Sequence, residues 1–104
     1  MLAALASAPA AAEPLFDIER VGEGVYAALP RPAAILNCNS AVFVGARGVT
    51  VLDSHSKPSA ASALIAQIRR EITPKPIRFL IITHGHYDHS QGSRAFRNLD
   101  PRPE

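Results

Sequence analysis

Cysteine is almost absent from this sequence, because Cys38 is the only one among 104 residues. An intrachain disulfide and a cysteine-based zinc site are therefore excluded, and a lone cysteine is most often a small buried hydrophobic residue. An excess of charge is also absent. The formal net charge is +2 and the arginines are scattered, so no nucleic-acid surface is indicated. The pair Arg69–Arg70 is typical of the solvated end of a helix.

Long hydrophobic runs are missing as well. The opening segment 1–12, MLAALASAPAAA, is rich in alanine and leucine but too short to cross a membrane. It resembles the end of a secretory signal peptide, with Ala10–Ala11–Ala12 as a cleavage site, although no basic region precedes it. The alternative is an unstructured alanine-rich terminus. We expect residues 1–12 to be a signal-peptide remnant or disordered, which slightly favours a periplasmic or secreted location over a cytoplasmic one.

The remaining segment, residues 13–104, is long enough for one small domain and contains no internal repeat. β-rich runs predict strands over 16–20, 25–29, 40–45 and 49–53, and the glycine-flanked ARG between the last two predicts a hairpin. Apolar residues at helical spacing predict a helix over 58–72. The apolar run 77–83 predicts a strand covered on both faces, and a short helix should follow over about 91–98. A helix between two strands indicates a β-α-β crossover in a layered α/β sheet.

Histidine is scarce except in one place. Three of the four histidines and one aspartate lie within THGHYDHSQG, residues 83–92, directly after the apolar strand. Residues two apart in an extended chain point to the same side, so His84 and His86 can direct their imidazoles at one point. If the chain begins to coil at Asp88, Asp88 and His89 serve a neighbouring point. Such donors suit zinc or a pair of borderline metals.

The histidine cluster has two alternatives to metal binding, a structural one and an adventitious one. Purely structural histidines would need several separate coincidences, because neutral imidazoles need partners and charged ones repel each other. An adventitious histidine-rich loop would not usually come with an embedded aspartate, flanking glycines and a preceding apolar strand. Metal binding is therefore the favoured interpretation.

THGHYDH resembles the T-H-x-H-x-D-H signature of metallo-β-lactamase-fold hydrolases, and VTVLDSHSKP resembles the strand ending in aspartate that precedes it there. The similarity runs from about Val21 to about Asn98, and HSQG departs from the commoner H-x-G-G ending. It implies an α/β fold: a partial αββα metallo-β-lactamase sandwich, of which residues 13–104 are the N-terminal part, a mixed β-sheet with flanking helices.

The resemblance also implies the roles of individual residues. His84 and His86 would bind a first metal, and Asp88 and His89 a second. Asp88 would in addition be catalytic, by orienting the reactive hydroxide and handling a proton. Asp53 would support the site without being a ligand. His55, to which the signature assigns no role, is expected to be a loop residue and not a further ligand.

The implied activity is that of a zinc-dependent hydrolase with two ions per complete domain, in which a metal-bound hydroxide attacks an ester, thioester, amide or phosphoester bond of a small-molecule substrate. Iron or manganese in place of zinc is an alternative, and iron would allow an oxidoreductase on the same fold. The family fold is about twice as long as this chain and takes further ligands from its second half. We therefore expect an incomplete fragment, inactive in isolation, with an uncovered apolar sheet face. A non-catalytic metal-binding half that needs a complementing C-terminal half is the third alternative.

Overall fold

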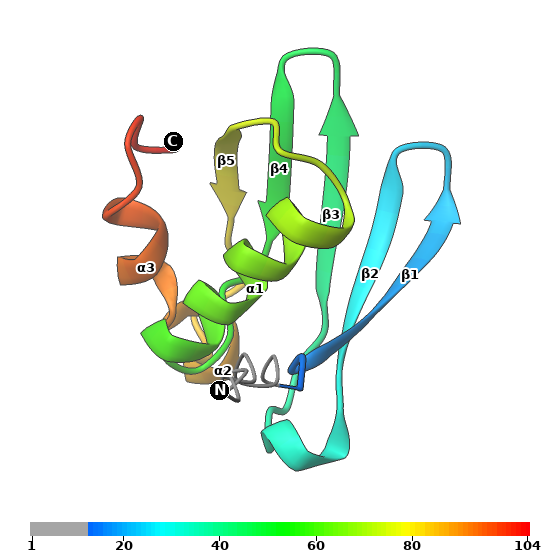
Figure 1. The fold of residues 1–104 in the computed structure, drawn as a ribbon. Helices are drawn as coiled ribbons and strands as arrows, with labels where there is room; N and C mark the ends of the chain where they lie inside the picture. The colour runs from blue at the N-terminus through cyan, green and yellow to red at the C-terminus, as the bar shows by residue number, and fades with distance from the viewer. Residues whose placement is uncertain (1–12) are drawn as a thin grey trace, which may run out of the picture.

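The computed structural model describes residues 13–104, so the expected signal-peptide remnant at 1–12 lies outside the described residues. Five strands form one mixed sheet in the order of the sequence: β1 Phe16–Gly22, β2 Val25–Pro30, β3 Ser40–Gly45, β4 Gly48–Leu52 and β5 Ile77–Ile81 (Figure 1). The first four pair antiparallel, whereas β5 runs parallel to β4. The helical elements are η1 Pro32–Ala34, α1 Pro58–Glu71, α2 Tyr87–Ser90 and α3 Ser93–Arg97. The predicted α/β class, the hairpin between β3 and β4 and the β4-α1-β5 crossover are confirmed.

Helix α1 forms where the apolar spacing predicts it. Pro58 occupies the first turn, where its missing N–H costs no hydrogen bond, and Arg69 and Arg70 lie in the last turn. The apolar stripe that includes Leu64 and Ile68 is fully buried against the sheet. Buried Gln67 ties the helix to β1, because its side chain donates to the carbonyl oxygen of Phe16 (2.6 Å) and accepts from the Phe16 N–H (3.3 Å).

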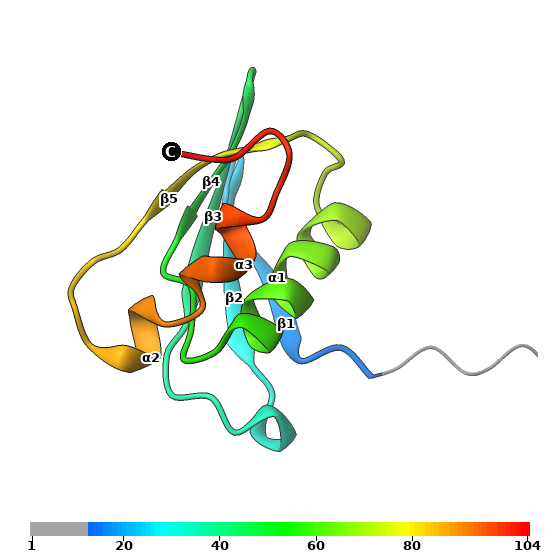
Figure 2. The same ribbon diagram turned by 90° about the vertical axis from the view of Figure 1, so that its left-hand side faces the viewer.

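The core lies on one face of the sheet. Helices α1 and α3 both pack on this face, as the edge-on view shows (Figure 2). The sheet contributes Val42, Val49 and Val51, and α3 contributes Phe96, all of them buried. Among the described residues, no helix is long and apolar enough to span a membrane.

The opposite face of the sheet is open and partly apolar. Strand pairing places Phe43 beside Thr50, Thr50 beside Phe79, and Leu52 beside Ile81. Phe79 and Ile81 are 44% and 50% exposed. The uncovered apolar sheet face expected from the sequence is therefore confirmed, and the prediction of a β5 covered on both faces is wrong, because the helices within residues 13–104 cover only one side. The apolar run lacks alternation because the uncovered face is apolar too, as expected for half of a two-sheet sandwich.

The segment after β5 contains one helix more than the sequence predicts. The short helix predicted over about 91–98 is confirmed as α3, and α2 precedes it, separated from it by Gln91 and Gly92. In a continuous helix the N–H of Gly92 would donate to the carbonyl oxygen of Asp88. It donates to the carbonyl oxygen of His55 instead (2.9 Å), so a tertiary hydrogen bond replaces the helical one.

Candidate metal centre

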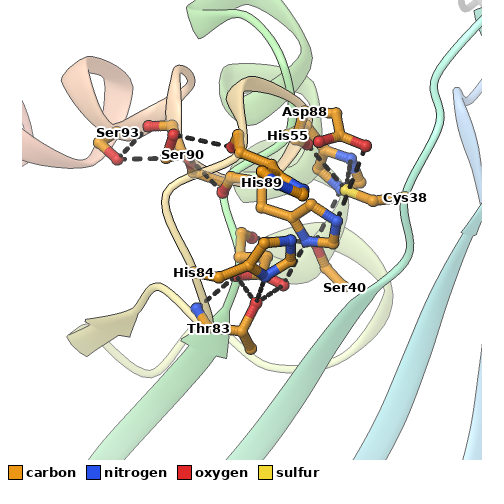
Figure 3. A network of polar contacts seen from close by, with 12 residues as sticks. Cys38, Ser40, His55, Thr83, His84, Asp88, His89, Ser90 and Ser93 are labelled. Atoms are coloured by element: carbon orange, nitrogen blue, oxygen red, sulfur yellow. Dashed lines mark hydrogen bonds and ion pairs between the residues drawn. The ribbon is translucent and has the colours of Figure 1, made fainter.

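The histidine loop, residues 83–92, leaves the carboxyl end of β5 next to the residues that leave the carboxyl end of β4. Parallel neighbouring strands end at the same edge of a sheet, which is where ligands bind in open α/β folds. The N–H of Asp53 donates to the carbonyl oxygen of Ile81 at 2.8 Å, which continues the pairing one residue beyond β4. Asp53 and the histidine loop are thereby brought together. Figure 3 shows the Thr83, His84 and His89 side chains of this loop.

Asp53 is the hydrogen-bonding centre of the site. Its carboxylate is nearly buried, with the residue 4% exposed, and it accepts from the Thr83 N–H (2.9 Å), the Thr83 hydroxyl (2.9 and 3.0 Å to its two oxygens) and Nδ1 of His89 (2.7 Å). Burial by itself would raise the pKa of Asp53, but the hydrogen bonds from Thr83 and His89 lower it below its ordinary value. Asp53 is thus an anion at neutral pH.

These contacts determine which ring nitrogen carries the proton in two of the histidines. The single hydroxyl proton of Thr83 is given to Asp53, so Thr83 Oγ1 accepts from Nδ1 of His84 at 2.8 Å. Nδ1 of His89 donates to Asp53. In the neutral form of each ring Nε2 is therefore the nitrogen left with a lone pair, the form in which imidazole binds a metal.

The four predicted ligands lie close together. The ring centre of His84 is 4.6 Å from that of His86 and 4.2 Å from that of His89. Oδ2 of Asp88 is 3.7 Å from Nε2 of His89. The two predicted pairs, His84 with His86 and Asp88 with His89, are therefore adjacent. Within residues 13–104 no group of three or more His, Cys, Asp or Glu side chains is arranged to hold a metal ion. The donors fit zinc in chemical kind, and their assignment as ligands remains a prediction.

Sequence reasoning assigned no role to His55. It lies in the loop between β4 and α1, as expected, but it is fully buried. Its Nε2 is 2.7 Å from Oγ of Ser40, and its Nδ1 is 3.4 Å from Sγ of Cys38. Burial lowers the pKa of His55 to about 4, so the ring is neutral. Nothing in the local sequence DSHS distinguishes a buried histidine from an exposed one.

Cys38 is buried, as predicted for a lone cysteine, and it also has a polar contact. Its thiol lies 2.9 Å from the carbonyl oxygen of Asp88, to which it donates (Figure 3). Burial, together with the charges of Asp53 and Asp88, raises the pKa of the thiol to about 11. Cys38 is therefore a protonated hydrogen-bond donor and not a reactive thiolate.

Comparison with known proteins agrees with this architecture. The family model of the metallo-β-lactamase superfamily matches residues 34–101, more than half of the chain. The chain belongs to the metallo-β-lactamase superfamily. No curated protein matches the sequence significantly.

Solved structures show the same fold. A metallo-β-lactamase from Hirschia baltica is 21% identical, with a TM-score of 0.65 over 79% of this chain and 39% of its own. The mono-zinc form of the metallo-β-lactamase FIM-1 from Pseudomonas aeruginosa is 19% identical, with a TM-score of 0.67 over 79% and 38%. A metallo-β-lactamase from Erythrobacter litoralis, with β-mercaptoethanol in its active site, is 17% identical, with a TM-score of 0.70 over 86% and 41%. This chain therefore spans about two fifths of the length of these structures.

Proposed function

We propose that this chain provides the N-terminal half of the metal centre of a zinc-dependent hydrolase. In this proposal His84 and His86 bind one zinc ion, and Asp88 and His89 bind a second. The observation that carries it is the hydrogen-bond arrangement around Asp53. Asp53 and Thr83 occupy Nδ1 of His89 and His84, and so leave Nε2 of both rings available to bind a metal.

Zinc would supply a Lewis acid and a bound water whose pKa is lowered to near 7. The chain's own residues would orient the ligands, balance charge and transfer protons. Asp53, held as an anion, orients His89 and balances positive charge at the site. Asp88 places a carboxylate 3.7 Å from His89, where it can accept a proton from a reacting group and release it again.

The open face of the sheet supports the proposal that a complementing C-terminal half completes the protein. The chain covers about two fifths of the structures it resembles, and Phe43, Phe79 and Ile81 are exposed on the open face. A catalytic zinc usually takes three protein ligands, one more than each pair supplied here. We propose that the missing ligands lie in that half and that this segment alone is inactive. The substrate would be a small molecule with an ester, thioester, amide or phosphoester bond.

Metal analysis of the complete protein, purified without a histidine tag, tests this function. Two equivalents of zinc are expected, with the first lost in His84→Ala and in His86→Ala together with hydrolytic activity. His55→Gln, which changes the only histidine outside the loop, is the control and should keep both equivalents at saturating zinc. Undiminished turnover in His86→Ala would refute the ligand assignment. Iron in place of zinc would replace the hydrolase by an oxidoreductase.

A further inference from the structure

Helix α2 places two of the proposed ligands, Asp88 and His89, on only one turn of helix. The carbonyl groups of such a short helix lack the donors that a longer helix would supply from its next turn. Here the donors come from elsewhere in the chain. The thiol of Cys38 donates to the carbonyl oxygen of Asp88 at 2.9 Å, and the N–H and hydroxyl of Ser54 donate to that of His89 at 2.7 and 3.1 Å. The backbone that carries these ligands is therefore positioned from outside the histidine loop.

Ser54 belongs to a strained turn. Its neighbours Asp53 and His55 have φ angles of 71° and 67°, in the left-handed region that residues other than glycine rarely adopt. Such a conformation persists only where its surroundings determine it. The 53–55 turn therefore needs a stabilising contact, and the buried side chain of His55 is placed to provide one.

The protons in this contact can be assigned. The hydroxyl of Ser40 donates to the carbonyl oxygen of Asp53 (2.9 Å), so Oγ of Ser40 accepts from Nε2–H of His55 (2.7 Å). The His55 ring is thus hydrogen-bonded to Ser40 at the start of β3, and Ser40 is hydrogen-bonded to the backbone of Asp53 in the 53–55 turn. Nδ1 of the ring faces Cys38 at 3.4 Å, and its other neighbours include Phe16, with ring centres 4.8 Å apart.

We propose that His55 is a positioning residue for the metal centre. Its ring holds the 53–55 turn through the hydrogen bond to Ser40 and packs against the Cys38 thiol at 3.4 Å, so that Ser54 and Cys38 stay in the places from which they donate to the carbonyls of His89 and Asp88. The effect on metal binding rests on the proposed function, whereas the effect on the backbone does not. His55 is not a ligand in this proposal, so its loss should weaken zinc affinity and leave the number of zinc ions unchanged.

Hydrogen exchange measured by NMR on the complete protein without metal tests the backbone effect. The reporters are the amides of Ser54 and Gly92, which donate to His89 and His55. Both should exchange at least about tenfold faster in His55→Leu, and His55→Gln, which keeps a donor for Ser40, should restore slow exchange. Gln67→Leu is the matched control: it removes two buried hydrogen bonds between α1 and β1 and should leave both reporters unchanged.

Zinc titration of the same variants tests the consequence for the site. Outer residues that orient ligands typically change metal affinity by 10- to 100-fold, so a loss of about tenfold is expected in His55→Leu with unchanged stoichiometry. If His55→Leu does not fold, Cys38→Ala and Cys38→Ser replace it, because only serine keeps a donor for Asp88. Reporter exchange that is unchanged in His55→Leu, or equally fast in Gln67→Leu, overturns the inference. A wild-type protein that binds no zinc overturns the proposed function, and the exchange data still decide the role of His55.

Discussion

Acid should destabilise this fold through His55 before it affects Asp53. Burial is the largest influence on the pKa of His55. The negative charge of Asp53 favours the protonated ring and electrostatic repulsion by His89 opposes it, so that burial and these two influences leave the pKa at about 4 against an ordinary 6.5. The unfolded chain therefore takes up a proton on His55 at a higher pH than the folded chain does. The contribution to stability is complete above about pH 6.5 and is lost as the pH falls through the interval down to about 4.

The size of the effect follows from the shift. A difference of 2.5 pKa units at about 1.36 kcal/mol each corresponds to roughly 3.4 kcal/mol when the interval has been crossed, and to about 2 kcal/mol at pH 5. Asp53 behaves differently, because its pKa is lowered by its hydrogen bonds. Its stabilisation is present above its unfolded value of 3.8 and is lost only below that value. The two titrations thus occupy separate pH intervals.

Urea unfolding between pH 7.5 and 4.5 measures this effect. Far-UV circular dichroism is the suitable probe because the sequence has no tryptophan. A chelator should be present, since metal binding is itself pH-dependent. His55→Gln is the control, because it keeps an amide donor for Ser40 but cannot titrate, and the other histidines contribute equally to both proteins. The wild-type protein should lose about 2 kcal/mol more than the variant by pH 5. Parallel stability curves for the two proteins would refute the assignment of a buried neutral His55.

Three further outcomes are expected. Gly92→Ala should lower the free energy of unfolding in urea by at least about 2 kcal/mol, because a Cβ there overlaps the carbonyl oxygen of Ser54. Gly85→Ala is the control and should lower it far less, since no atom lies within 4 Å of the added Cβ. Equal losses in the two variants would contradict the packing argument. The thiol of Cys38 has its pKa raised from 9.0 to about 11, so the folded state should lose roughly 2.7 kcal/mol as the pH rises through that interval, and this alkaline loss should be absent in Cys38→Ala. Thr83→Val should weaken zinc binding by 10- to 100-fold in a calorimetric titration while Thr83→Ser retains it; unchanged affinity in the valine variant would show that the hydroxyl does not orient the histidine loop.

The local elements of this fold could be predicted because each has a signal in neighbouring residues. The spacing of Leu64, Ile65 and Ile68 defines α1, and the glycines around ARG define the hairpin between β3 and β4. The segment THGHYDHS names the candidate ligands, because three histidines and an aspartate in six positions have no simple structural cause. The α/β class and the superfamily also followed from these short stretches.

Contacts between distant residues could not be predicted. Whether the run Phe79–Ile82 is covered on one face or two depends on what packs on the sheet, and its uniform apolar character is compatible with both. The break between α2 and α3 has the same kind of cause, since the N–H of Gly92 bonds to His55, thirty-seven positions away by residue number.

Sequence by itself thus determined the architecture of this segment and the identity of its candidate metal-binding side chains, because helical spacing, turn residues and a dense cluster of donors are properties of adjacent residues. Tertiary structure alone decided the proton positions on His84 and His89, the anionic state of Asp53 and the burial of His55. These properties depend on which atoms are in contact at the sheet edge formed by β4 and β5. Hydrogen-bond direction and desolvation result from contacts between distant residues, which the local sequence does not specify.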